Sequence, residues 1–164
     1  MPRCLVCALL IVFSAQHVFA QDTVARVYAD RKNQVHVVST NGKDTLVAPE
    51  PGQIGIDSAQ TAEDRKTVGW LVQYKDPDGG APLAGTLVIW RAGKVIRRFQ
   101  VDQTFWSWAF YAKSAQVAWH DGPTHGETNS HCELHDINSG RLLSTWDGDL
   151  EDANRPPWTA VLTH

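Results

Sequence analysis

The polar segment between residues 120 and 136 has the side chains best suited to chemistry in this sequence. If residues 131–135 form a strand, His131, Glu133 and His135 lie on one face, because side chains alternate along a strand. Neighbouring side chains on that face are close enough for one metal ion to bind two of them, and a histidine from the flanking chain would complete the coordination. A zinc or copper site is therefore one interpretation of the segment. Its candidate ligands are His120, His125, His131, Glu133 and His135.

The spacing of these residues matches no established catalytic motif. His131-Cys132-Glu133 has the H-x-E order of zinc deaminases, but the cysteine pair of that motif is missing. The order also differs from the helical H-E-x-x-H motif of metalloproteases. We therefore favour a solvated loop followed by an edge strand over a metal site, and we predict no catalytic residue and no cofactor. Cys132 alternates with its two neighbours, so we expect it to be buried as a small apolar residue.

Tryptophan is unusually frequent, with seven in the chain. Trp106 and Trp108 are two positions apart, which places both on one face of a strand. Two exposed indoles on one face would form a stacking platform for a sugar or an aromatic ligand, so these two are the predicted ligand-binding residues. The alternative is that they fill the space between sheets, as we expect for Trp70 and Trp119.

These candidates must be positioned by strands, because the sequence indicates an all-β protein. Short β-branched and aromatic runs are bounded by turn signals such as Asn41-Gly42 and Asp78-Gly79-Gly80. No stretch has a sustained helical period, although residues 57–65 would accommodate one helical turn. The predicted strands span residues 35–38, 68–74, 86–90, 95–101, 105–111 and 116–120.

The strands recur at a long, regular spacing. Gly42, Gly93 and Gly140 each end a strand–turn unit and precede a basic residue, and they are 51 and 47 residues apart (93 − 42 and 140 − 93). Residues 59–70 also match residues 108–119, each a strand, a polar turn and a strand with a large aromatic residue. Repeats of this length are typical of four-stranded blades. We therefore predict antiparallel blade-like sheets in an incomplete or small β-propeller-like repeat, with a β-sandwich or a small barrel as the alternative.

Residues 134–146 resemble the strand–turn–strand unit of WD40-like and TolB-type β-propeller blades, and residues 62–70 are similar to the polar turn and Val-x-aromatic strand of those blades. The resemblance implies a propeller-like fold, but a closed propeller needs about four blades and this chain has room for about three. An open stack would expose a sheet edge and an apolar face, which predicts self-association through that edge. Pairing of a strand near residues 24–28 with one near residues 158–162 would instead indicate closure.

The first 20 residues are predicted to be a secretory signal peptide. Arg3 is followed by an apolar run over residues 5–13 and by the cleavage pattern Val18-Phe19-Ala20. The apolar run is too short to span a membrane, and we expect no membrane span after cleavage. Residues 21–164 are then one β-repeat domain of 144 residues (164 − 20) with a single cysteine and no N-x-[ST] sequon. These features favour a bacterial periplasmic or secreted protein.

The mild negative charge of the chain limits the classes of function that the sequence supports. The net charge of −3 becomes −4 without Arg3, which argues against a nucleic-acid partner. We expect an exported, non-enzymatic binding or interaction protein that recognises a protein or a small ligand through its loops or open edge. A metal-binding protein or metal-dependent enzyme is the second hypothesis, with zinc or copper as the sole cofactors considered. A remnant of a larger propeller is the third.

Overall fold

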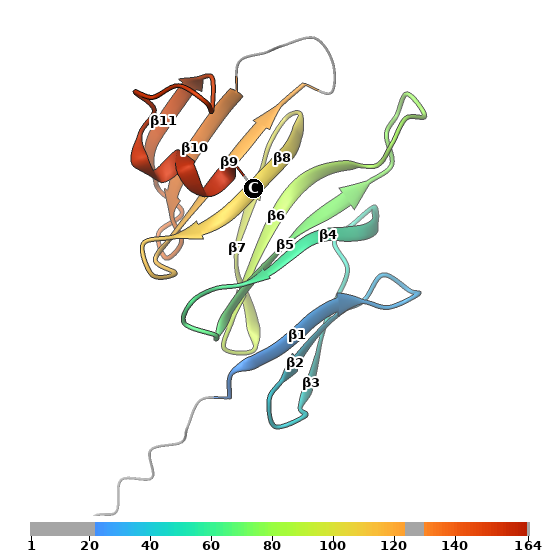
Figure 1. The fold of residues 1–164 in the computed structure, drawn as a ribbon. Helices are drawn as coiled ribbons and strands as arrows, with labels where there is room; N and C mark the ends of the chain where they lie inside the picture. The colour runs from blue at the N-terminus through green and yellow to red at the C-terminus, as the bar shows by residue number, and fades with distance from the viewer. Residues whose placement is uncertain (1–21, 124–129, 164) are drawn as a thin grey trace, which may run out of the picture.

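The computed structural model describes residues 22–123 and 130–163, and it confirms the all-β prediction. Within these residues the strands form three antiparallel sheets, stacked one on the next (Figure 1). The first sheet contains β1 (Val24–Ala29), β2 (Val35–Ser39) and β3 (Asp44–Val47). The second contains β4 (Gln53–Thr61), β5 (Thr67–Tyr74), β6 (Leu83–Arg91) and β7 (Lys94–Gln100). The third contains β8 (Thr104–Tyr111), β9 (Gln116–Gly122), β10 (Ser130–Asp136) and β11 (Leu142–Gly148).

Each sheet is a meander in which neighbouring strands follow one another in the sequence. The glycines that revealed the spacing occupy equivalent turns, between β2 and β3, β6 and β7, and β10 and β11. Their φ angles are 86° at Gly42, 88° at Gly93 and 75° at Gly140, a left-handed conformation that glycine adopts without a steric cost. The last hairpin of each sheet therefore turns through a glycine with a positive φ.

Residues 57–65, which would accommodate one helical turn, form none. Strand β4 extends through residue 61, and a tight turn leads into β5. Both carboxylate oxygens of Asp64 accept hydrogen bonds within this turn, from the Lys66 and Thr67 amides and from the Thr67 hydroxyl. A short acidic side chain that bonds its own backbone in this way favours a turn over a helix.

Two apolar layers hold the three sheets together. The layer between the first and second sheets includes Val35, Val37, Trp70 and Trp90. The layer between the second and third sheets includes Leu87, Phe99, Trp108 and Trp119. Side chains of β5 and β6 alternate between the two layers, so the second sheet is buried on both faces, as its continuous apolar sequence requires.

A 3₁₀ helix, η1 (Pro157–Leu162), covers the far face of the third sheet (Figure 1). Trp158 and Leu162 of η1 pack against Ala118, Cys132 and Leu134. Residues 158–162 therefore form no strand, and β1 pairs with β2 instead, so the described residues form an open stack. No helix in the described part of the chain is long and apolar enough to cross a membrane.

Candidate functional site

The first sheet exposes apolar and aromatic side chains on the face that points away from the second sheet. Tyr28, His36 and Leu46 lie directly opposite one another on β1, β2 and β3, so they share one face. Val35 and Val37 point the other way into the apolar layer, where they are buried. Tyr28 is 37% exposed and Leu46 is 57% exposed. We call this surface the outer face.

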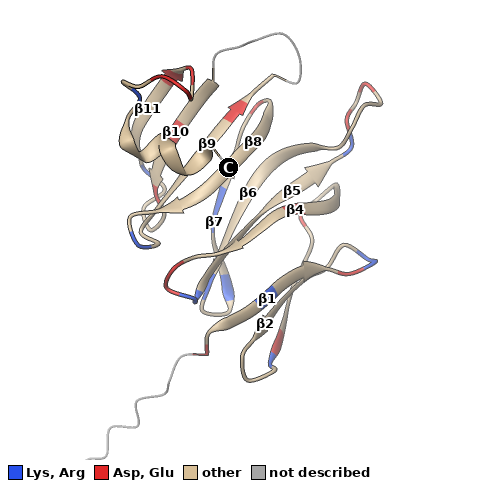
Figure 2. Cartoon of the chain, viewed as in Figure 1, with Lys and Arg blue, Asp and Glu red and all other residues tan. Residues whose placement is uncertain are grey.

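The outer face also has charges of both signs, as Figure 2 shows for the first sheet. The guanidinium carbon of Arg26 lies 5.1 Å from the ring centre of Tyr28, and the Tyr28 ring stacks on His36 at 4.6 Å. The Nδ1 atom of His36 lies 2.8 Å from an oxygen of Asp44, which raises the pKa of His36 above its ordinary value. The face thus has an aromatic centre, a basic group on β1 and an acidic group on β3.

The predicted histidine cluster lies on the opposite side of the stack, in the third sheet. His131, Glu133 and His135 share one face of β10, as the alternation predicted, and this face points toward the second sheet. The His135 ring is packed between aromatic side chains, stacked on Trp119 at 4.4 Å and edge-on to Phe99 at 5.1 Å. His135 is therefore part of the apolar layer rather than of an open site.

Hydrogen bonds already occupy the ring nitrogens of both histidines. The carboxylate of Glu133 bridges them, 3.2 Å from His131 Nε2 and 2.7 Å from His135 Nε2. Nδ1 of His131 lies 2.5 Å from Asp147, and Nδ1 of His135 donates to the carbonyl oxygen of Gly140. The hydrogen bond with Asp147 raises the pKa of His131, so the proton that a metal would have to displace is stabilised there.

The predicted zinc or copper site is not assembled among the described residues. His120 is paired with Cys132, so it lies on the face covered by η1, across the sheet from His131 and His135. Burial lowers the pKa of His120. In residues 22–123 and 130–163, no group of three or more His, Cys, Asp or Glu side chains is arranged to hold a metal ion. His125 lies outside the described residues, as does the predicted signal peptide.

A cleft of about 420 Å³ borders this cluster, formed by the β7–β8 loop with Asp121, His131 and Glu133. Burial raises the pKa of Asp121, and its Oδ1 atom is buried with no hydrogen-bond partner among the described residues. The cleft is acidic, but the imidazole that lines it, His131, is held by the carboxylates of Glu133 and Asp147. Its geometry fits a structural polar network better than a catalytic one.

The predicted tryptophan platform is not formed. The register of β8 shifts between Phe105 and Ser107, and this bulge separates the two indoles. Trp108 is 3% exposed, and its Nε1 donates to the carbonyl oxygen of Ser58 at 3.0 Å. Trp106 is 51% exposed and stands alone. Trp108 therefore fills the space between sheets, and so do Trp70 and Trp119, as predicted.

Cys132 is buried beneath η1, beside Leu134, as the alternation predicted. Burial is the main cause that raises the pKa of the Cys132 thiol from 9.0 to about 12. The negative charges of the nearby Asp121 and Asp147 carboxylates raise it further in the same direction. A thiol in this environment is almost entirely protonated at neutral pH, which makes it a poor nucleophile.

No protein-family model matches this chain, and no curated protein is significantly similar to it. Sequence reasoning missed the outer face, although the alternation Val35-His36-Val37 indicated that one face of β2 is polar and aromatic.

Proposed function

We propose that this protein is an exported, non-enzymatic interaction protein and that the outer face of the first sheet is its binding surface. The supporting observation is the asymmetry of the stack. Trp158 and Leu162 cover the third sheet, whereas Tyr28 and Leu46 of the first sheet are exposed. Adjacent exposed apolar side chains on a sheet face are a common feature of protein–protein contacts. The signal-like pattern in residues 1–20 supports export.

A second copy of the chain is the partner that best fits this face. The three sheets already pack face to face, and the same type of packing would bury the outer face against another sheet. We favour the face over the edge because β1 already packs against β4 of the second sheet, while β3 is short and precedes Pro49 and Pro51.

Two rows of side chains make the outer face complementary to itself. Arg26, Val38 and Asp44 are cross-strand neighbours in one row, and Tyr28, His36 and Leu46 form the next. A twofold axis along β2 exchanges β1 with β3. It places Arg26 against Asp44 of the second copy, and Tyr28 against its Leu46. An isologous interface of this kind therefore pairs opposite charges and apolar side chains together.

The small size of the first sheet limits the strength of this contact. Three strands of four to six residues offer less area than the roughly 800 Å² per partner of a standard stable interface. We therefore expect a weak dimer with a dissociation constant on the order of micromolar. This dimer should dissociate when the protein is diluted.

The test is the molar mass of the purified protein by light scattering over a wide range of concentrations. We expect the mass to double as concentration rises, and Leu46→Glu to remain monomeric. The matched control is Leu142→Glu on β11, because Leu142 is 45% exposed and lies outside the outer face. A wild-type protein that stays monomeric at several hundred micromolar, or a Leu142→Glu variant that dissociates as Leu46→Glu does, contradicts the proposal.

A further inference from the structure

A second site lies between the first two sheets, away from the outer face. It is a cleft of about 300 Å³, a volume at the lower end of ligand-binding pockets. Strands β1, β2, β3 and β6 form its walls, and the β4–β5 and β6–β7 turns form its rim. The backbone amide of Val24 donates to the carbonyl oxygen of Arg65 at 2.7 Å, which ties the first sheet to the β4–β5 turn beside the cleft.

The floor of the cleft is apolar. Val24, Val37 and Trp90 line it, and all three belong to the buried layer between the sheets. Trp90 is 8% exposed, and its indole Nε1 is buried with no acceptor among the described residues. Because this nitrogen is itself buried, the wall presents an apolar surface to a ligand in the cleft.

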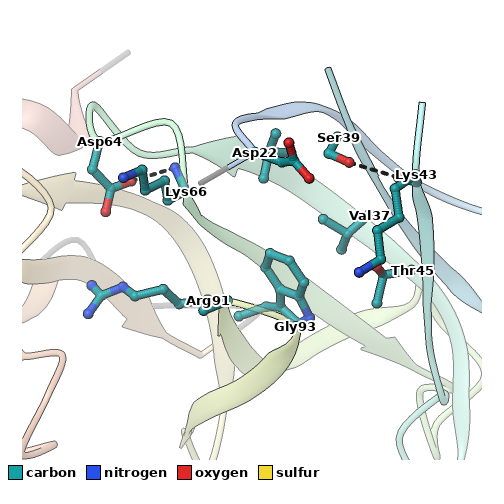
Figure 3. Close-up of a pocket in the computed structure, with 12 residues that line it drawn as sticks. Asp22, Val37, Ser39, Lys43, Thr45, Asp64, Lys66, Arg91 and Gly93 are labelled. Carbon is teal, nitrogen blue, oxygen red and sulfur yellow. Dashed lines mark hydrogen bonds between the residues drawn. The ribbon is translucent and has the colours of Figure 1, made fainter. Parts of the chain in front are cut away.

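The rim of the cleft has two lysine side chains. Lys43 and Lys66 line the cleft from opposite sheets, and neither forms an ion pair with a described residue. Figure 3 shows Lys43 extending alongside Thr45 on one side, with Lys66 on the other. A ligand lying across the cleft would meet both ammonium groups.

The other charged residues at the cleft already have protein partners. Asp22 accepts a hydrogen bond from the Asn41 side-chain amide at 2.6 Å, and Asp64 accepts three within its own turn. Arg91 points away from the cleft in Figure 3 and donates to Thr67 and to groups of the third sheet. Both carboxylates keep their negative charge while they accept these hydrogen bonds. The five charged residues that line the cleft therefore sum to +1 (3 − 2), a balance that suits a ligand with one negative charge.

From this arrangement we infer that the cleft binds an amphipathic monoanion, a small molecule with an apolar body and one carboxylate or sulfonate group. The apolar body packs against Val24, Val37 and Trp90, and the anionic group lies between Lys43 and Lys66. This site is independent of the outer face, because Val37 and Tyr28 belong to opposite faces of the first sheet.

The test uses 8-anilinonaphthalene-1-sulfonate, a fluorescent monoanion, and N-phenyl-1-naphthylamine, which has the same ring system without the charge. We expect saturable binding of the sulfonate at one site per chain. The double variant Lys43→Gln/Lys66→Gln should bind the sulfonate roughly fivefold more weakly, as expected for two solvent-exposed ion pairs, and bind the neutral dye as the wild type does. Added salt should weaken sulfonate binding alone.

Two control variants locate the dye. Lys32→Gln/Lys75→Gln removes two charges that do not line the cleft, and Leu46→Ser removes apolar area from the outer face. Both should bind the sulfonate with wild-type affinity. The inference is overturned if the folded protein shows no saturable binding, if Lys43→Gln/Lys66→Gln binds with wild-type affinity, or if Leu46→Ser abolishes binding.

Discussion

The cover that η1 forms over the third sheet predicts the reactivity of Cys132. Trp158 is 7% exposed and packs with Cys132, which is fully buried. Replacing a buried tryptophan by alanine costs about 3–5 kcal/mol. The substitution Trp158→Ala should therefore release η1 from the sheet and open a path for solvent to the thiol.

The size of the effect follows from the pKa of the thiol. With a pKa of about 12, roughly one Cys132 in ten thousand is ionised at pH 8, whereas at the ordinary value of 9.0 about one in ten is ionised. Loss of the cover thus raises the thiolate fraction by at most about a thousandfold, because the nearby carboxylates of Asp121 and Asp147 remain. The rate of reaction with an aromatic disulfide reagent, followed by absorbance at pH 8, reports this change. Cys4→Ser and Cys7→Ser leave Cys132 as the single thiol.

Two controls separate local exposure from general instability. Trp106→Ala removes an exposed indole and should leave the labelling rate unchanged. Leu87→Ala creates a cavity in the layer between the second and third sheets, at a cost of about 2–5 kcal/mol, without touching η1. If Trp158→Ala labels at the wild-type rate, or if Leu87→Ala accelerates labelling as much, the proposed role of η1 is refuted.

Three further predictions concern stability, measured as the urea midpoint. Gly69→Ala should cost about 1–3 kcal/mol, because its Cβ would lie 2.6 Å from the Trp108 ring. Arg91→Met should cost about 1–3 kcal/mol through loss of its three hydrogen bonds. For Gly69→Ala and for Arg91→Met alike, a urea midpoint equal to that of the wild type would contradict the prediction. The hydrogen bond to Asp44 raises the pKa of His36, so this histidine stabilises the fold most below pH 6.5 and progressively less as pH rises through its folded-state pKa. His36→Gln should remove that dependence, and an identical pH profile would refute it.

Local sequence signals were enough to predict six of the strands, β2 and β5 to β9, but not β4, where a helical turn was considered instead. The glycines at 42, 93 and 140 occupy positions with positive φ, which few other residues adopt, so their spacing revealed the equivalent hairpins. The burial of Cys132 followed from strict alternation along β10. These features depend on a few neighbouring residues, so a single sequence contains the necessary information.

The candidate sites were harder to predict because they depend on register and on contacts distant in the sequence. The bulge in β8 moved Trp108 into the interior and left Trp106 exposed, and no residue type marks such a bulge. His120 faces η1 because β9 and β10 pair in a register that sequence alone does not show. The outer face is exposed because nothing in the described chain packs on it, which is a property of the whole stack.

Cross-linking at the centre of the outer face tests the central claim most directly. The proposed twofold axis brings residue 36 of one copy against residue 36 of the other. With Cys4→Ser and Cys7→Ser as background, His36→Cys treated with a short bis-maleimide should give a covalent dimer on a denaturing gel. Thr145→Cys, on the exposed strand β11, serves as the comparison. The account predicts dimer from His36→Cys alone; monomer from His36→Cys, or equal dimer from Thr145→Cys, would contradict it.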